Sequence, residues 1–223
     1  EPTEAELLAI RSEVMASDVE AYQDNTVSEP LIPADIKLKG SPVKKTAYNE
    51  DLGTTEWILK NGVKIIVKPT QLKADEVLMV ATADGGTSLL PTSEVKEGEF
   101  LPIIAAQSGV GKFSAIELNK QLAGKKAGVE LNVNNYSNGM SGYCSPKDIE
   151  TMLQLLYLNF TSPRFSEEDF NTTMNSYKAY VQNLTSNPDY IMSIETIKTL
   201  YSDNPRQQPL TIEALESISF ENL

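Results

Sequence analysis

The sequence predicts an α+β fold in which an antiparallel β-sheet carries helices on one face. Asn61-Gly62 stands between two β-prone runs, which is a strong signal for a β-hairpin. Residues 129–135 alternate between apolar and polar side chains, as in a half-buried strand, and a second hairpin follows them. Three helical patterns then follow one another from Ser145 onward. The strands are therefore expected to pair through hairpins, and several helices are expected to follow one another in the sequence.

Length and composition fit one domain of ordinary size with a tail. The chain has 223 residues, of which 40% are hydrophobic, enough for a core. Its net charge of −12 repels phosphate backbones, so we expect no nucleic acid partner. The acidic surface is explained most simply by solubility. No stretch approaches the roughly 20 apolar residues that a membrane helix needs, so we expect no membrane span.

The first segment, residues 1–25, is predicted to be a helix that belongs to a preceding domain. Thr3 and Glu6 have the spacing of a capping box, in which each side chain bonds the backbone amide of the other. Apolar residues recur at helical spacing after the cap, at Leu7, Ile10 and Val14. The pattern is expected to fade near Tyr22–Asn25.

Residues 26–54 are predicted to be an extended interdomain linker. They contain Pro30, Pro33 and Pro42, and their apolar residues follow no sustained period. Proline fixes φ and lacks an amide hydrogen, so regular pairing is not expected. The alternative is a long loop wrapped over a domain.

Residues 55–223 are the predicted α+β domain. Its third strand is nearly continuous in apolar character, which favours a central place in the sheet. The expected strands cover Glu56–Lys60, Val63–Lys68, Glu76–Ala83, Val129–Asn135 and Asn138–Cys144.

Five helices are expected in this domain, most of them with clear start signals. Ser114 and Glu117 form a second capping box, and Gly124 is a stop signal. Ser145-Pro146 supplies a cap and a proline at the first position. The helices cover about Glu94–Ser108, Ser114–Ala123, Pro146–Phe160, Glu167–Leu184 and Tyr190–Tyr201.

The composition argues against most hydrolytic chemistry. The chain has no histidine and a single cysteine, Cys144. Catalytic triads need an imidazole, and hydrolytic zinc sites usually need two or three nitrogen or thiolate ligands. We therefore predict no catalytic residue and no metal ligand in this chain. A pair of carboxylates remains possible, but the 31 acidic residues offer no basis for choosing one pair. Cys144 is expected to be a buried, inert thiol.

Several motifs together resemble the second half of zinc metallopeptidases of the pitrilysin/insulinase type, the inverted zincins. The resemblance covers about Thr55–Leu223, and only the combination is specific. The motifs are Thr55-Glu56-Trp57-Ile58-Leu59-Lys60-Asn61-Gly62-Val63, Gly85-Gly86-Thr87-Ser88-Leu89, Gly109-Val110-Gly111 with Phe113-Ser114, Ser145-Pro146-Lys147-Asp148-Ile149-Glu150 and Pro163-Arg164-Phe165.

The resemblance implies an architecture and a function. Such enzymes have two related halves, each of two α+β domains with the mitochondrial-processing-peptidase-like (LuxS-like metallohydrolase) fold, and the halves close around a chamber. The first half carries an H-x-x-E-H helix with two zinc ligands and a general base. The second half is a degenerate copy that shapes the chamber. This chain resembles the third domain, so zinc is implied only for the full-length protein. The alternative is a structural or assembly module of the same fold without associated peptidase activity.

The resemblance also implies where the lost site would lie. The segment equivalent to the zinc helix is about Glu99–Gln107, and the positions equivalent to the zinc motif are Phe100, Ile103 and Ile104. Pro102 is expected to distort the helix. The implied partners are the other domains of the same polypeptide and, in the full-length enzyme, a peptide substrate. A periplasmic or secreted location is expected, because bacterial relatives often lie outside the cytoplasm.

Overall fold

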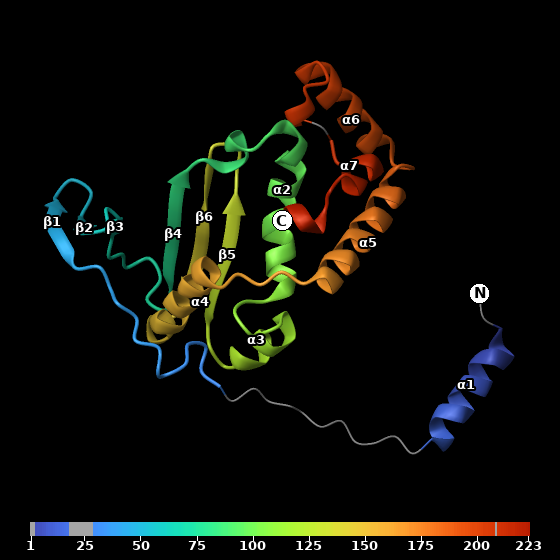
Figure 1. Ribbon diagram of the computed structural model, residues 1–223, viewed down its shortest axis with the longest axis horizontal. Helices are drawn as coiled ribbons and strands as arrows, with labels where there is room; N and C mark the ends of the chain where they lie inside the picture. The colour runs from blue at the N-terminus through green and yellow to red at the C-terminus, as the bar shows by residue number, and fades with distance from the viewer. Residues whose placement is uncertain (1–2, 18–28, 208) are drawn as a thin grey trace.

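The computed structural model describes residues 3–17, 29–207 and 209–223, and it has an α+β architecture with two antiparallel sheets (Figure 1). The first helix, α1, spans Glu4–Ala16 and starts with the predicted capping box. The Thr3 amide donates to Glu6 Oε2 at 2.7 Å. The helix ends before the expected fade at Tyr22–Asn25, which lies outside the described residues. None of its residues is buried, so its apolar stripe is exposed.

The first sheet has the order β1-β2-β3, with β1 at Val43–Asn49, β2 at Thr54–Leu59 and β3 at Lys64–Val67. The predicted β2–β3 hairpin is confirmed. The expectation that the linker forms no regular pairing is wrong for β1, because all the linker prolines precede Val43 and leave the later residues free to pair.

The β2–β3 turn differs from the two-residue turn that Asn61-Gly62 predicts. The Leu59 amide donates to the Val63 carbonyl oxygen at 2.8 Å, which encloses a three-residue loop. Only Gly62 in this loop has a positive φ, at 92°. The geometry matches three-residue hairpin loops, which place a left-handed residue last.

The second sheet has the order β4-β6-β5, with β4 at Val77–Asp84, β5 at Ala127–Val133 and β6 at Ser137–Cys144. The predicted central place of β4 is wrong, because β4 is an edge strand. Its apolar run reflects a face that nothing in the described chain covers, with Leu78 71% and Val80 76% exposed. The central strand β6 is rich in small residues. A Cβ at Gly139 would lie 1.9 Å from the Ala81 carbonyl oxygen, so glycine allows the close pairing with β4.

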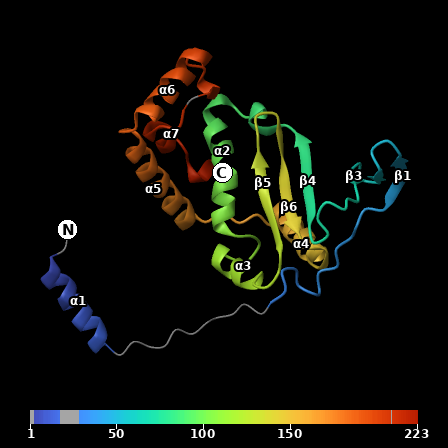
Figure 2. The same cartoon turned by 180° about the vertical axis from the view of Figure 1, so that it is seen from behind.

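All five predicted helices are present, with small shifts at their ends. The contacts place α4 against β5 and β6, and α2 runs beside β5 (Figures 1 and 2). A further short helix, α7, was not expected. The helices are α2 (Val95–Ser108), α3 (Ala115–Gln121), α4 (Ile149–Thr161), α5 (Glu167–Leu184), α6 (Pro188–Tyr201) and α7 (Ile212–Glu216), with short 3₁₀ turns that include Gly86–Leu89, Pro146–Asp148 and Pro205–Gln207.

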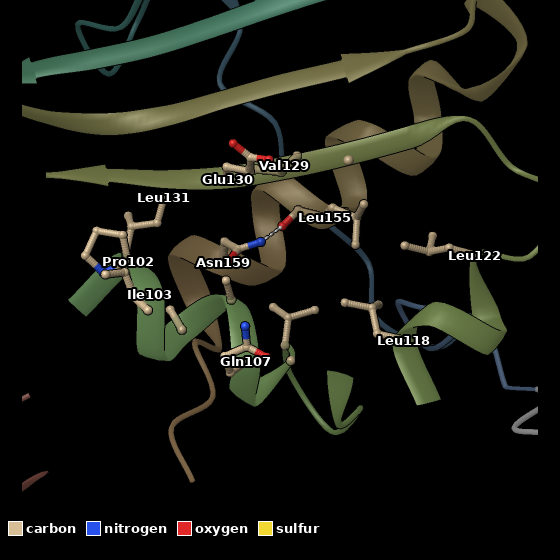
Figure 3. A pocket seen from close by; sticks show the side chains of 15 residues that line it. Pro102, Ile103, Gln107, Leu118, Leu122, Val129, Glu130, Leu131, Leu155 and Asn159 are labelled. Atoms are coloured by element: carbon tan, nitrogen blue, oxygen red, sulfur yellow. Dashed lines mark hydrogen bonds between the residues drawn. The ribbon is translucent and has the colours of Figure 1, made fainter. Parts of the chain in front are cut away.

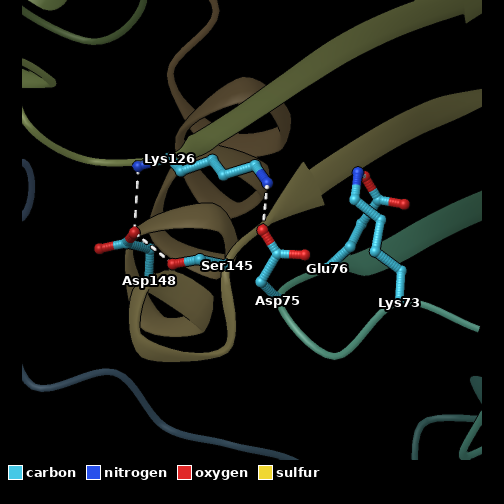
Figure 4. A network of polar contacts seen from close by, with 6 residues as sticks. All are labelled: Lys73, Asp75, Glu76, Lys126, Ser145 and Asp148. Carbon is cyan, nitrogen blue, oxygen red and sulfur yellow. Dashed lines mark hydrogen bonds and ion pairs between the residues drawn. The ribbon is translucent and has the colours of Figure 1, made fainter. Parts of the chain in front are cut away.

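A polar network joins the start of β5 to the start of α4 (Figure 4). Asp148 Oδ2 accepts hydrogen bonds from the Ser145 hydroxyl at 2.5 Å and from the Lys126 amide at 3.0 Å. The Lys126 ammonium lies 3.3 Å from Asp75, which precedes β4. The network therefore ties together the segments at one end of the second sheet.

The apolar core consists of several clusters. One lies between α2, α5 and α7, and a second lies under α4 and includes Leu31, from the predicted linker, at 4% exposure. The Gln121 side chain also donates to the Glu29 carbonyl oxygen at 2.8 Å, and Glu29 pairs with Lys112. This part of the linker therefore lies against the domain. The buried members are Phe100, Ile104, Phe170, Met174, Val181, Leu215 and Ile218 in the first cluster and Leu31, Val110, Phe113, Leu155 and Leu158 in the second.

Candidate functional site

The three positions that the resemblance singles out lie on α2. Phe100 and Ile104 are one helical turn apart, at 4% and 0% exposure, and both belong to the cluster between α2 and α5. The Phe100 ring meets the Tyr177 ring edge-on, with 5.1 Å between centroids and 72° between planes. Ile103 is only partly buried and packs against the same cluster. Two of the three positions are therefore filled by close-packed hydrophobic side chains.

Zinc does not fit at these positions. Phenylalanine and isoleucine side chains carry no nitrogen, oxygen or sulfur that could serve as a ligand. Across residues 3–17, 29–207 and 209–223, no group of three or more His, Cys, Asp or Glu side chains could hold a metal ion. Cys144 lies elsewhere, fully buried beside Ala127 and Met152. Burial, and then the charge of Asp148, raises the pKa of its thiol, as expected for an inert cysteine.

A buried acid on α2 was missed from the sequence. Glu97 lies one turn before Phe100 with only 4% exposure, and its Oε2 has no hydrogen-bond partner within the described ranges. Its place in the first turn of α2 lets the helix dipole stabilise a carboxylate. One carboxylate cannot supply a zinc ligand set. Nothing in the sequence pattern distinguishes Glu97 from Glu94 or Glu99.

A cavity of about 440 Å³ is lined by residues of α2 and β5, which also contact each other, and by residues of α3 and α4 (Figure 3). Its volume falls in the range of about 300–1,000 Å³ typical of ligand sites. Pro102 lines it, and since proline has no amide hydrogen, the Gly98 carbonyl lacks its usual helical donor. The walls are mostly apolar and include Pro102, Ile103, Leu118, Leu122, Val129, Leu131 and Leu155, together with Gln107, Glu130 and Asn159.

The β5 strand borders this cavity with a free edge. Among the described strands it pairs only with β6. Two hydrogen bonds of 2.8 Å lie at the two ends of the β5–β6 pairing. The Asn134 amide donates to the Ser137 carbonyl oxygen, and the Ser145 amide donates to the Lys126 carbonyl oxygen. Antiparallel pairs alternate, so the even-numbered β5 residues bond to β6 and the odd-numbered ones point away from it. Val129, Leu131 and Val133 thus direct amide and carbonyl groups away from β6, and Val129 and Leu131 line the apolar cavity.

The comparisons with known proteins agree with the α+β fold. The sequence is similar to those of zinc proteases, and the fold is one found in M16 peptidase structures. No family model matches the sequence. One similar sequence is a "Zinc protease PQQL-like" protein of Arabidopsis thaliana, 27% identical over 203 residues, which covers 90% of this chain and 18% of that protein. Another is the "Probable zinc protease PqqL" of Haemophilus influenzae, 21% identical over 158 residues, with coverages of 69% and 17%.

Two solved structures have a similar fold. The periplasmic protease PqqL of Escherichia coli matches with a TM-score of 0.70 and 16% identity, over 96% of this chain and 23% of that one. The peptidase M16 inactive domain of Pseudomonas fluorescens matches with a TM-score of 0.59 and 16% identity, over 77% and 42%. The chain thus spans less than a fifth of the length of the two sequence relatives. No helix in the described part of the chain has the length and apolar character needed to cross a bilayer.

Proposed function

We propose that this chain is a non-catalytic domain of a larger zinc metalloendopeptidase, in which another part of the polypeptide holds the zinc. The observation that supports the proposal is the apolar cluster to which Phe100, Ile103 and Ile104 belong, in a chain with sequence similarity to zinc proteases. These three residues are proposed to be the degenerate counterparts of the zinc motif. Zinc therefore belongs to the full-length protein and has no place on α2.

The division of the chain follows from the same proposal. Residues 1–25 form a helix of the preceding domain, 26–54 form the connector, and 55–223 form the peptidase-like domain. The exposed apolar stripe of α1 supports this division, since Leu7, Ile10 and Val14 are 53%, 56% and 57% exposed and need a partner surface. The burial of Leu31 against residues of the domain supports a connector that is anchored on the domain near this residue.

The domain is proposed to shape the substrate chamber of the full-length enzyme. The uncovered face of the second sheet, with Leu78 and Val80, offers an apolar wall. The partners are the other domains of the polypeptide and a peptide substrate. A periplasmic or secreted location is proposed because the similar protease PqqL of E. coli is periplasmic.

The test compares the full-length protein with a variant that lacks residues 55–223. We expect both to bind zinc and only the full-length protein to cleave peptides at its full rate. The isolated chain is expected to hold no zinc and to cleave nothing, measured by metal analysis and a fluorogenic peptide assay. Stoichiometric zinc and peptide turnover in the isolated chain would overturn the proposal. A full-length protein without zinc and without turnover would favour the assembly module.

A further inference from the structure

We propose that the loop between β2 and β3 is a site of spontaneous covalent modification, at which Asn61 loses its side-chain amide and becomes a mixture of aspartate and isoaspartate. Water is the only co-reactant that the reaction needs. The inference does not depend on the proposed function, because every protein group that reacts belongs to the loop itself.

The reaction starts at the backbone nitrogen of Gly62. This nitrogen attacks the side-chain carbonyl carbon of Asn61, Cγ, and the new C–N bond closes a succinimide ring. The side-chain nitrogen of Asn61 leaves as ammonia and takes the proton of the Gly62 amide with it. Water then opens the ring. Its attack at Cγ gives aspartate, and its attack at the main-chain carbonyl carbon of residue 61 gives isoaspartate, in which the main chain runs through Cγ.

The loop holds the reacting groups close together. The Val63 amide donates to Asn61 Oδ1 at 3.3 Å, and this turn brings the Asn61 side chain back over the Gly62 peptide between them. Oδ1 is also the oxygen that gains negative charge when Cγ is attacked, so the Val63 amide already points at the developing charge. A Cβ added at Gly62 would meet nothing within 4 Å, so the space around its nitrogen is open.

The loop can also rearrange at little cost. Asn61, Gly62 and Val63 are all exposed. The Gly62 amide donates to the Leu59 carbonyl oxygen at 3.0 Å, and this bond must break before the nitrogen can attack. Neither β2 nor β3 contains a buried residue, so opening this end of the hairpin disturbs no packed core.

The chain contains a second Asn-Gly pair, Asn138-Gly139, which the fold protects. Asn138 is exposed as well, so exposure of the asparagine does not distinguish the two sites. Gly139 lies in the central strand β6, opposite Thr82 of β4 and Asn132 of β5. Because the even-numbered residues of β5 bond to β6, the Gly139 amide is held in the ladder. Its nitrogen can attack only after the second sheet has opened.

The two pairs are compared in the full 223-residue chain, incubated at mildly alkaline pH and followed by peptide mapping with mass spectrometry. We expect Asn61 to react at least about a hundredfold faster than Asn138, because an exposed loop opens at almost no cost and a central strand opens only with much of the fold. In guanidinium chloride the two rates should become similar, since the fold no longer protects Gly139. Similar rates in the native chain, or no reaction at Asn61, would overturn the proposal.

The products identify the ring. Hydrolysis of the amide by water without ring closure gives aspartate alone, so isoaspartate at residue 61 is expected, and its absence would overturn the proposed route. The rate should also rise with hydroxide concentration, because the Gly62 nitrogen must lose its proton to attack. A rate that does not change with pH would show that this nitrogen is not the nucleophile.

Two matched variants assign the reaction to the loop. Asn61→Gln keeps an amide but places its carbonyl carbon one methylene further away, which makes ring closure less favourable. We expect it to remove the new acidic species that ion-exchange chromatography separates from the parent chain. Asn138→Gln is the control and should leave the amount of this species unchanged. An acidic species that persists in Asn61→Gln and disappears in Asn138→Gln would place the modification in β6 and overturn the proposal.

Discussion

The guanidinium of Arg206 donates to the Leu90 carbonyl oxygen at 2.6 Å and to the Thr87 carbonyl oxygen at 3.0 Å. Arg206 lies in the turn after α6, whereas Thr87 and Leu90 belong to the segment between β4 and α2. One side chain thus joins two parts of the chain that are 116 and 119 residues apart in sequence. These two hydrogen bonds hold the segment that leads into α2 in place.

Arg206→Ala is expected to destabilise the fold by about 1–3 kcal/mol, because two hydrogen bonds from a charged group are lost. Arg206→Lys should recover only part of this, since an ammonium cannot reproduce the planar, two-pronged geometry. Urea unfolding followed by circular dichroism gives the free energies. The control is Lys198→Ala, which removes an exposed ion pair with Glu195 and should cost less than about 1 kcal/mol. Similar losses for Arg206→Ala and Lys198→Ala would contradict the role of Arg206.

Leu31→Ala is expected to cost about 2–5 kcal/mol, because a buried leucine leaves a cavity among Val110, Phe113 and Leu155. It should also speed proteolysis of the connector, since the anchor that holds it is weakened. Ile36→Ala is the matched control on the same segment, at a side chain that is 49% exposed. The prediction fails if the two variants unfold at the same urea concentration.

Ile104→Ala should destabilise the chain by about 2–5 kcal/mol, because Ile104 is fully buried between α2 and α5. Ile116→Ala, at a residue that is 72% exposed on α3, is expected to change little. The comparison tests whether the position that we propose as equivalent to a zinc ligand is a core position. A neutral Ile104→Ala variant would show that it has not.

Asp148 is expected to stabilise the fold at neutral pH and to lose this effect in acid. Hydrogen bonds from the Ser145 hydroxyl, and then from the Lys126 amide, lower the pKa of Asp148. A lowered folded-state pKa means that this stabilisation is present above the ordinary aspartate pKa and is lost as pH falls through the lowered value. Asp148→Asn should therefore be less stable than the parent chain at neutral pH, with the two curves converging in acid.

Ser145→Ala provides the matched test for Asp148. It removes one donor and keeps the carboxylate, so the pKa of Asp148 should rise toward its ordinary value. Stability measured from pH 2 to 7 should then fall off at a higher pH than in the parent chain. A constant difference between the parent and Asp148→Asn at every pH would contradict the assignment.

Local signals in the sequence were sufficient for much of the fold. The capping boxes at Thr3 and Ser114 are present as predicted, because they depend on residues only three positions apart. The Ser166 cap of α5 and the β2–β3 hairpin are also local in origin. The prediction that this chain has no zinc site rests on composition alone, since the chain has no histidine and a single cysteine.

Long-range packing could not be predicted in the same way. An apolar run such as that of β4 has the same pattern whether both faces are buried or one is uncovered, so the edge position was missed. The burial of Leu31 depends on partners far away in the sequence, among them Val110 and Leu155. The free edge of β5 and its cavity depend on where α2 lies, which periodicity does not encode.

The edge of β4 has a practical consequence for handling the protein. Between Val77 and Ala83 this strand has no charge and no proline, and Leu78 and Val80 project from it into solvent. Charges, prolines and bulges are the devices that keep edge strands from joining their counterparts on other molecules. The 223-residue chain produced alone should therefore self-associate more strongly as its concentration rises. Val80→Lys is the simplest substitution that would reduce this self-association.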